Sequence, residues 1–262
     1  MSESKFRPDL SVSNETIELM LRHHSVRAYS DKPVPEEMLQ AVIAAAQSPS
    51  TWQNGNNWSL VVVKDPEIKR TLMKLTKRNA FMEDAPIFLV WCADMSRTAE
   101  ATKRSGEDFV GVDYADTILV PTVDAALAAQ SAAIAAESLG LGICYIGGVR
   151  TSLAEVSDLL NLPHYCFPVT GMTLGWPSKD DTAREKPRMP QSGQVFVNRY
   201  DQDASLQAIE EMDANTREYW RSQGMEEVSW SQRAGHSWQT LEYLAGRDVN
   251  TQVFRNRGYS LK

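Results

Sequence analysis

Five short clusters of polar residues and glycines carry the groups that could bind an anionic or planar ligand. The first holds His23, His24, Ser25 and Arg27, at the end of a predicted helix. Guanidinium, imidazole and hydroxyl groups together supply many hydrogen-bond donors and no carboxylate, a composition that suits phosphate. The alternative is a solvated helix end, where the helix dipole favours cations, and the spacing alone favours this alternative somewhat.

Two more clusters lie in turn-rich segments. Ser50, Thr51 and Gln53 offer hydroxyl and amide groups to a polar ligand, although this composition more often marks an ordinary loop. Lys186 and Arg188 flank a proline that holds the two cations apart. Their spacing suits a phosphate, and a surface loop is its commoner meaning.

The last two clusters each adjoin a regular element. Asn79 follows a predicted helix, where a helix cap is its default role. Tyr145, Ile146, Gly147 and Gly148 end a predicted strand. Paired glycines let a backbone approach a planar ligand and point its N–H groups at that ligand, and a tight turn is the alternative. Because no cluster pairs a nucleophile with a base, the five together predict a bound cofactor that carries out the chemistry itself.

Several classes of protein have no support in the sequence. Gly140-Leu141-Gly142 does not continue to the third glycine of a dinucleotide-binding fingerprint, and neither a Walker A motif nor a GxSxG elbow occurs. The three cysteines are isolated, so no metal site is expected. A net charge of −7 and a pI near 5.2 argue against nucleic acid or an anionic membrane as the main partner.

The cysteine count and the first residues predict a cytoplasmic protein. Three cysteines without a disulfide pattern favour a reducing compartment. Residues 1–5 lack the basic and apolar pattern of a signal peptide. The longest apolar run, 118–146, contains Pro121, Asp124, Gln130 and Glu137, so we expect a buried helix there rather than a membrane span.

Hydrophobic periodicity predicts the elements that position these clusters. Helices are expected at 13–23, from 35, after 66, and at 117–139, 152–160, 205–221 and 237–245. Strands are expected at 58–64, 86–93, 142–148 and 167–174, with a further short strand at 195–197. Residues 96–114 are either an ordered excursion or a mobile lid. The composition changes after Pro177, which divides the chain into a core, 1–177, and an arm, 178–262, that packs on a partner subunit.

The order of the motifs resembles the nitroreductase superfamily, in particular the oxygen-insensitive NADPH nitroreductases and the NADPH-flavin reductases. The resemblance rests on His23-His-Ser-Val-Arg27, the Ser50-Thr51 loop, Ala135–Gly142, Tyr145–Arg150, Thr173–Pro177 and Lys186-Pro-Arg188. It implies an α+β fold, with a mostly antiparallel central sheet flanked by helices. It also implies an intertwined homodimer with exchanged C-terminal arms. Two tightly bound FMN molecules are expected at the dimer interface, each touched by both chains, with 1–177 as the FMN-binding core domain.

The resemblance implies a role for each cluster. His23, Ser25, Lys186 and Arg188 are expected to hold the FMN phosphate, with His24 beside them. Arg27 is expected near the pyrimidine edge of the flavin, where a fixed cation favours the reduced anion. Thr51 and Asn79, with Ser50 and Gln53, are expected to bond the ring or the ribityl chain. The backbone of residues 145–148 is expected to contact the ring near its reacting nitrogen.

The implied activity is two-electron ping-pong transfer from NAD(P)H through FMN to a small planar oxidant such as a nitroaromatic, a quinone or free flavin. A reductase that releases reduced FMN to a partner, and a flavin carrier or sensor without turnover, are the alternatives. NADPH-preferring members carry an arginine-bearing loop after the long C-terminal helix. Here Glu226 and Glu227 occupy that region, while Arg217, Arg221 and Arg233 lie nearby, so the choice between NADH and NADPH stays open.

Overall fold

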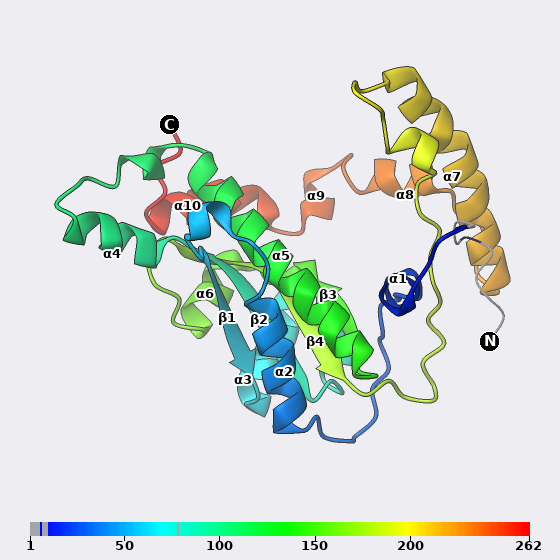
Figure 1. Ribbon diagram of the computed structural model, residues 1–262, viewed down its shortest axis with the longest axis horizontal. Coiled ribbons are helices and arrows are strands. Elements are labelled where there is room, and N and C mark those ends of the chain that lie inside the picture. Colours follow the sequence, from blue (N-terminus) through cyan, green and yellow to red (C-terminus); the bar gives the residue numbers. More distant parts are fainter. Residues whose placement is uncertain (1–5, 7–9, 78) are drawn as a thin grey trace. The chain divides into compact units, whose positions relative to one another are not determined.

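An antiparallel sheet of four strands forms the centre of the computed structural model, which describes residues 6, 10–77 and 79–262 (Figure 1). The strands are β1 (Trp58–Val63), β2 (Ile87–Asp94), β3 (Gly142–Ile146) and β4 (Cys166–Gly175). Their order is β1-β2-β4-β3, so β1 and β3 are the two edges. All four were predicted within a few residues of their bounds. Every residue of β2 is buried, which places this central strand in the core.

Helices cover both faces of the sheet because its side chains alternate between two apolar clusters. Ile87, Leu89 and Trp91 of β2 pack with α2 (Glu36–Ala46) and α5 (Asp116–Ser138) on one face. Phe88, Val90 and Cys92 pack on the opposite face with α3 (Pro66–Thr76), α6 (Leu153–Leu159) and Val149. The α+β class is thus confirmed, with each face shielded as period-two alternation requires.

The alanine-rich helix α5 lies against α2 and the sheet, as its small residues predicted (Figure 1). Six of its alanines are buried there: Ala125, Ala128, Ala129, Ala132, Ala133 and Ala136. Among the described residues it is the one helix whose length and composition would also suit a membrane span. Its other face carries Leu119, Val123 and Leu127, which are 58%, 56% and 44% exposed and recur at helical spacing.

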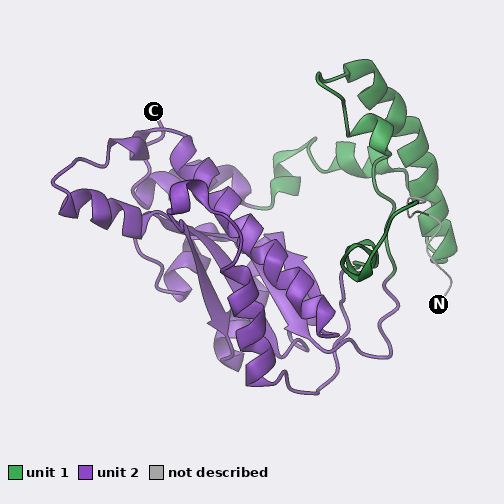
Figure 2. Cartoon of the chain, viewed as in Figure 1, with its two compact units in different colours: residues 1–24, 184–245 green, residues 25–183, 246–262 purple. Residues whose placement is uncertain are grey.

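The chain divides into two compact units (Figure 2). The larger comprises residues 25–183 and 246–262, and therefore includes α10 (Asn250–Asn256). The smaller comprises residues 1–24 and 184–245, with α1 (Glu15–Leu21), α7 (Gln202–Ser222), α8 (Trp230–His236) and α9 (Leu241–Leu244). In the smaller unit, α7 packs on α8 and on the short 3-10 helix Gln191–Gly193.

Two sequence expectations differ from the structure, and for residues 96–114 the structure agrees with one of the two alternatives. No strand forms at 195–197: the segment is irregular and Val195 and Val197 are largely exposed, because a strand needs a neighbouring edge that the described part of this chain does not place beside them. Residues 96–114 form an ordered excursion built from α4 (Ser96–Arg104) and a 3-10 turn, Val110–Asp113. The helix expected at 237–245 shrinks to α9, while α8 and α10 were not predicted.

The three cysteines are buried and none forms a disulfide. A hydrogen bond with Cys166, together with burial, raises the pKa of the Cys92 thiol well above its ordinary value. Since the thiolate is the reactive form, we expect negligible reaction of the native protein with a thiol-specific disulfide reagent at pH 8. All three thiols should titrate once the chain is denatured. Rapid modification of even one native thiol would contradict this expectation.

Candidate functional site

The segment Ser25–Ser30 is bound to the end of the sheet next to β3. Val26 N–H donates to the Ile143 carbonyl at 2.9 Å. The buried Tyr29 hydroxyl donates to the Val26 carbonyl at 2.9 Å and lies 2.7 Å from Thr173 Oγ1. Burial raises the pKa of this phenol, so the hydroxyl keeps its proton as a structural donor. These bonds fix the backbone on either side of Arg27.

Arg27 presents an exposed guanidinium beside a short 3-10 helix, Ala80–Met82. Its Cζ lies 5.9 Å from the centroid of the Phe81 ring, and its Nη1 donates to the Ser25 carbonyl at 3.2 Å. Its Nε and Nη2 donate no hydrogen bond to any residue that the structure describes. A cation with spare, oriented donors can bind an electron-rich ring edge.

Asn79 and Gly148 meet at the end of α3, although 69 positions separate them in the sequence. Asn79 Nδ2 donates to the carbonyls of Thr76 at 3.2 Å and Lys77 at 3.0 Å. A Cβ on Gly148 would lie 2.5 Å from the Thr76 carbonyl oxygen and 3.0 Å from Asn79 Nδ2. Glycine is therefore required for the 3-10 turn Gly147–Arg150 to pack here.

The side chains of Tyr145 and Ile146 are both engaged within the chain. The Tyr145 hydroxyl donates to Gln130 Oε1 of α5 at 3.2 Å, and Ile146 is buried in the cluster on the α3 face. A ligand at this strand end would therefore meet backbone, as the paired glycines predicted. The structure thus places Arg27 beside the short helix that follows Asn79, and Asn79 against the turn that follows Tyr145 and Ile146. These residues are called the Arg27 cluster below.

The Ser50–Gln53 loop lies on the opposite face of the sheet, bound to α5. Asp124 of α5 accepts hydrogen bonds from Trp52 N–H at 3.0 Å and from Asn57 N–H and Nδ2 at 3.2 Å each. Thr51 Oγ1 accepts from Asn56 N–H at 3.1 Å. Asn79 and Gly148 lie on the α3 face. Within one chain, the Ser50–Gln53 loop and the Arg27 cluster are therefore on different faces of the sheet.

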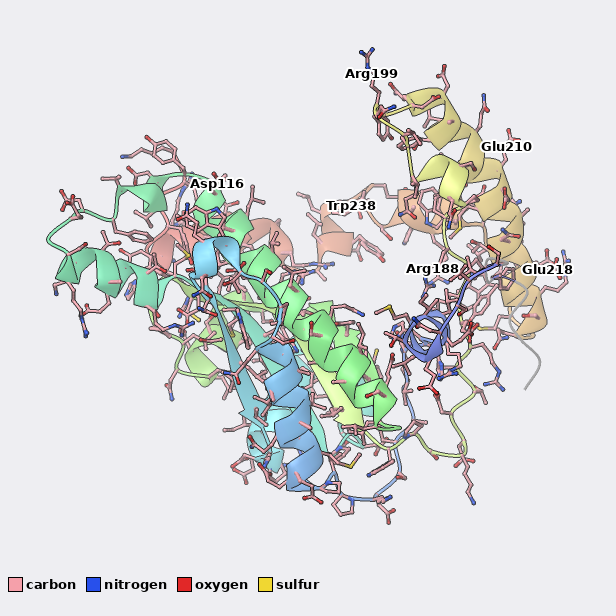
Figure 3. All side chains as sticks on the ribbon, viewed as in Figure 1. Asp116, Arg188, Arg199, Glu210, Glu218 and Trp238 are labelled. Atoms are coloured by element: carbon pink, nitrogen blue, oxygen red, sulfur yellow. The ribbon has the colours of Figure 1, made fainter. Side chains whose placement is uncertain are left out.

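The remaining predicted residues belong to the smaller unit. His23 and His24 follow α1, and His24 Nδ1 lies 3.2 Å from the Arg22 carbonyl. Arg188 is exposed and its Nη1 donates to the Lys186 carbonyl at 2.9 Å, while Pro187 between them is buried (Figure 3). The buried proline thus anchors a segment that presents two cations outward.

The sequence patterns did not indicate one pair of half-buried arginines, Arg150 and Arg247. Arg150 Nη1 donates to the Val169 carbonyl, its Nη2 lies near Gly147, and no described carboxylate forms an ion pair with it. Desolvation first, and then the charge of Arg247, lowers the pKa of Arg150. Arg247 reaches this point because Asn250 Nδ2 donates to the Arg150 carbonyl at 3.0 Å. Two cations whose charges act on each other therefore lie next to the glycine turn.

Comparison with known proteins gives the class of protein. Residues 20–176 match the nitroreductase family, and residues 186–262 match the C-terminal domain of that family. The chain therefore belongs to the nitroreductase family.

Individual relatives agree with this assignment over most of the chain. The "FMN reductase [NAD(P)H]" of Bacillus subtilis (strain 168) is 36% identical, covering 90% of this chain and 96% of that protein. The structure of NfrA2 from B. megaterium matches with a TM-score of 0.88 and 34% identity over 95% of this chain and all of that one. The NADPH:FMN oxidoreductase from Vibrio harveyi, complexed with NAD+, has a TM-score of 0.80 and 31% identity over 95% of this chain and all of that one.

Proposed function

We propose that this protein is an FMN-dependent oxidoreductase that uses NAD(P)H to reduce nitroaromatics, quinones or free flavin. The observation that carries the proposal is a row of contacts along β3: Arg27 lies beside Phe81 in the short helix that follows Asn79, and Asn79 contacts the Gly147-Gly148 turn. The names of the relatives support it, since they include an FMN reductase that uses NAD(P)H.

The residues fit an anionic flavin nucleotide. Around the Arg27 cluster the donors are a guanidinium, a carboxamide and backbone N–H groups, and the glycines leave the backbone accessible. When bound, FMN would supply the chemistry of accepting a hydride and passing on two electrons. We assign the phosphate to His23, Ser25, Lys186 and Arg188, with His24 beside them. Lysine and arginine suit a phosphate because they keep their positive charge at neutral pH.

The side chains orient the reactants and stabilise charge, and none acts as a general acid or base. Arg27 provides a fixed positive charge, which favours an anionic form of a ring held beside it. Asn79 and the backbone of Tyr145–Gly148 orient the ring. Arg150 and Arg247 give the same region positive character, which would attract electron-rich groups of a nucleotide or of an acceptor.

A homodimer would complete this site. The Ser50–Gln53 loop lies across the sheet from the Arg27 cluster, so we assign it to the flavin of the partner subunit. The exposed apolar stripe Leu119, Val123 and Leu127 on α5, next to that loop, fits a twofold contact. The open edge of β1 can accept an exchanged strand, for which residues 195–197 are the candidate. The buried thiols suit the reducing conditions of the cytoplasm.

Purification and anaerobic stopped-flow spectroscopy test the proposal. The protein should be yellow, should release FMN on denaturation, and should be bleached by NADH or NADPH and reoxidised by a nitroaromatic, a quinone or free FMN. Colourless protein that takes up no FMN would refute the proposal. Bound FMN that neither nicotinamide bleaches would instead favour a flavin carrier or sensor.

Substitution of Arg188 separates the phosphate from the ring. We expect Arg188→Ala to weaken FMN binding by about tenfold or more and to leave riboflavin affinity unchanged, because riboflavin lacks the phosphate that Arg188 is proposed to bind. Fluorescence titration of the apoprotein with both flavins measures this. Equal losses for FMN and riboflavin would show that Arg188 does not act on the phosphate.

The arginines in α7 and just after it, which could bind a 2′-phosphate, already interact with other side chains of the chain. Arg221 donates to both carboxylate oxygens of Glu227, at 2.6 and 2.8 Å, and this hydrogen bonding lowers the pKa of Glu227. Arg217 lies 3.8 Å from Asp213, and Arg233 lies 4.5 Å above the Trp220 ring. The arrangement favours NADH being used at least as well as NADPH.

Releasing Arg221 should therefore change the nicotinamide preference. We expect Glu227→Gln to lower the KM for NADPH several-fold and to leave the KM for NADH nearly unchanged, because an unpaired guanidinium can bind the additional phosphate. Steady-state kinetics with both nicotinamides measures the ratio. An unchanged ratio would mean that Arg221 does not reach the 2′-position.

A further inference from the structure

Three residues of the loop at 50–57 adopt the left-handed backbone conformation. Gln53, Asn54 and Asn56 have φ angles of 48°, 56° and 51°, in the left-handed region. Non-glycine residues populate this region sparsely, and several in one loop persist only when the surroundings fix them. The loop also carries Thr51 and Gln53, which the proposed function assigns to the flavin. Something outside the loop must therefore hold it in shape.

Asp124 is the central contact that does so. Its carboxylate lies on α5, is 2% exposed, and accepts three hydrogen bonds from the two ends of the loop, at Trp52 and Asn57. No described lysine or arginine forms an ion pair with it. A buried carboxylate whose charge is compensated only by loop N–H groups ties the geometry of the loop to that of the helix.

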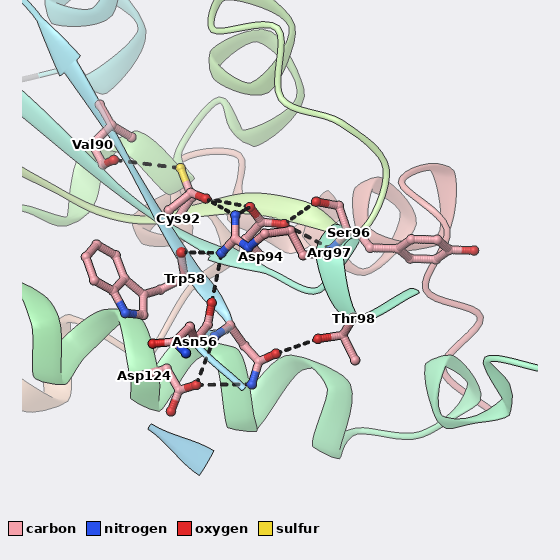
Figure 4. Close-up of polar contacts among 12 residues, drawn as sticks. Asn56, Trp58, Val90, Cys92, Asp94, Ser96, Arg97, Thr98 and Asp124 are labelled. Carbon is pink, nitrogen blue, oxygen red and sulfur yellow. Dashed lines mark hydrogen bonds and ion pairs between the residues drawn. The ribbon is translucent and has the colours of Figure 1, made fainter. Parts of the chain in front are cut away.

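A second set of bonds reaches the same loop from the junction of β2 and α4 (Figure 4). Thr98 Oγ1 donates to Asn57 Oδ1 at 2.8 Å, so Asn57 joins this set to Asp124. Arg97 Nη2 donates to the carbonyls of Asn56 and Trp58 at 2.8 and 2.7 Å. Nη1 of the same arginine binds Asp94 at 3.0 Å. The loop is thus held on both sides by side chains far from it in the sequence.

We propose that Asp124 is a positioning residue of the flavin site, which fixes the 50–57 loop so that Thr51 and Gln53 are presented to the flavin. The inference rests on the proposed function. Asp124 itself touches no flavin in this scheme, since it acts through the backbone N–H groups of Trp52 and Asn57.

The test is flavin binding by the Asp124→Asn variant. Asparagine keeps one acceptor and places an amide where donors now point, so the loop loses its anchor at nearly constant side-chain volume. We expect FMN and riboflavin affinities to fall by the same factor, about tenfold or more, because Thr51 and Gln53 are assigned to the ring or ribityl chain, which both flavins share. Amide hydrogen exchange at Trp52 and Asn57 should accelerate in the apoprotein, a readout that needs no flavin.

A matched control and a double-mutant cycle separate positioning from general destabilisation. Asp65 also accepts two backbone N–H bonds, from Glu67 and Ile68 at 2.8 and 3.0 Å, at the start of α3. Asp65→Asn should lower Tm and leave both flavin affinities unchanged below the transition. In the cycle, Asp124→Asn and Thr51→Val should be non-additive, since both act through the loop.

Each outcome bears on one claim. Wild-type protein that binds no flavin refutes the proposed function. Wild-type protein that binds flavin, with Asp124→Asn binding equally well, refutes only the positioning role, as do additive losses in the cycle. If Asp124→Asn does not fold, Thr98→Val replaces it, because it is similar in size and removes one loop bond from the opposite side. Unchanged flavin affinity in that variant would then overturn the proposal.

Discussion

Hybrid dimers of two nearly inactive variants are expected to regain activity, up to about half that of the wild type. One protomer carries Arg27→Glu, and its partner carries Thr51→Val together with Gln53→Ala. The expectation follows from the position of the loop on the α5 face and of Arg27 and Asn79 on the α3 side of the sheet. If each flavin uses Arg27 of one chain and the loop of the other, a hybrid contains one site with both intact.

Each variant alone should be severely impaired. Reversing the charge at Arg27 removes the fixed cation and opposes negative charge on the ring, which should slow flavin reduction by on the order of 100-fold. The loop variant loses the hydroxyl and carboxamide assigned to the flavin and should bind it weakly. The measurement uses two affinity tags to isolate the hybrid, followed by turnover with NADH and a quinone. A hybrid no more active than the mixed parent homodimers would place the loop and Arg27 at the same flavin within one chain.

Local patterns were sufficient for most of the fold. Short apolar runs bounded by turns predicted all four strands, and the alanine-rich pattern predicted α5 as the central helix. The strand predicted at 195–197 does not form within one chain, because strand formation depends on an available edge as well as on the apolar character of the segment. The sequence does not predict α8 and α10, because short and largely exposed helices have little apolar periodicity.

The composition of the site was easier to predict than its geometry. Arg27, Asn79 and Gly148 are each a weak signal in the sequence, and only the folded chain shows that Arg27 lies beside the helix after Asn79 and that Asn79 contacts Gly148. In the sequence Asp124 is only a polar interruption of an apolar run, because the N–H groups that donate to it lie 67 and 72 positions away. Arg247 lies 97 positions from Arg150, so no local pattern could connect the two.

Gly148→Ala is also expected to have a large effect and to weaken FMN binding by about 100-fold or more. The added methyl would lie 2.5 Å from the Thr76 carbonyl oxygen, a backbone atom at the end of α3, so either the 3-10 turn or the helix end must move. Both carry groups assigned to the flavin: the backbone N–H groups of the turn and the Asn79 carboxamide. Overpacking of this kind should also cost about 1–3 kcal/mol of stability.

Gly235→Ala is the matched control for this substitution. Gly235 lies in α8 with an ordinary negative φ, and a methyl there would meet no atom within 4 Å. Alanine is the better helix former, so this variant should be as stable as the wild type or more so, with unchanged flavin content. Flavin content after purification, FMN titration of the apoprotein and thermal unfolding compare the two variants. Wild-type FMN affinity in Gly148→Ala would show that the glycine turn does not contact the flavin. Loss of flavin at constant Tm would show instead that the turn acts on the ligand directly, independently of its contribution to folding.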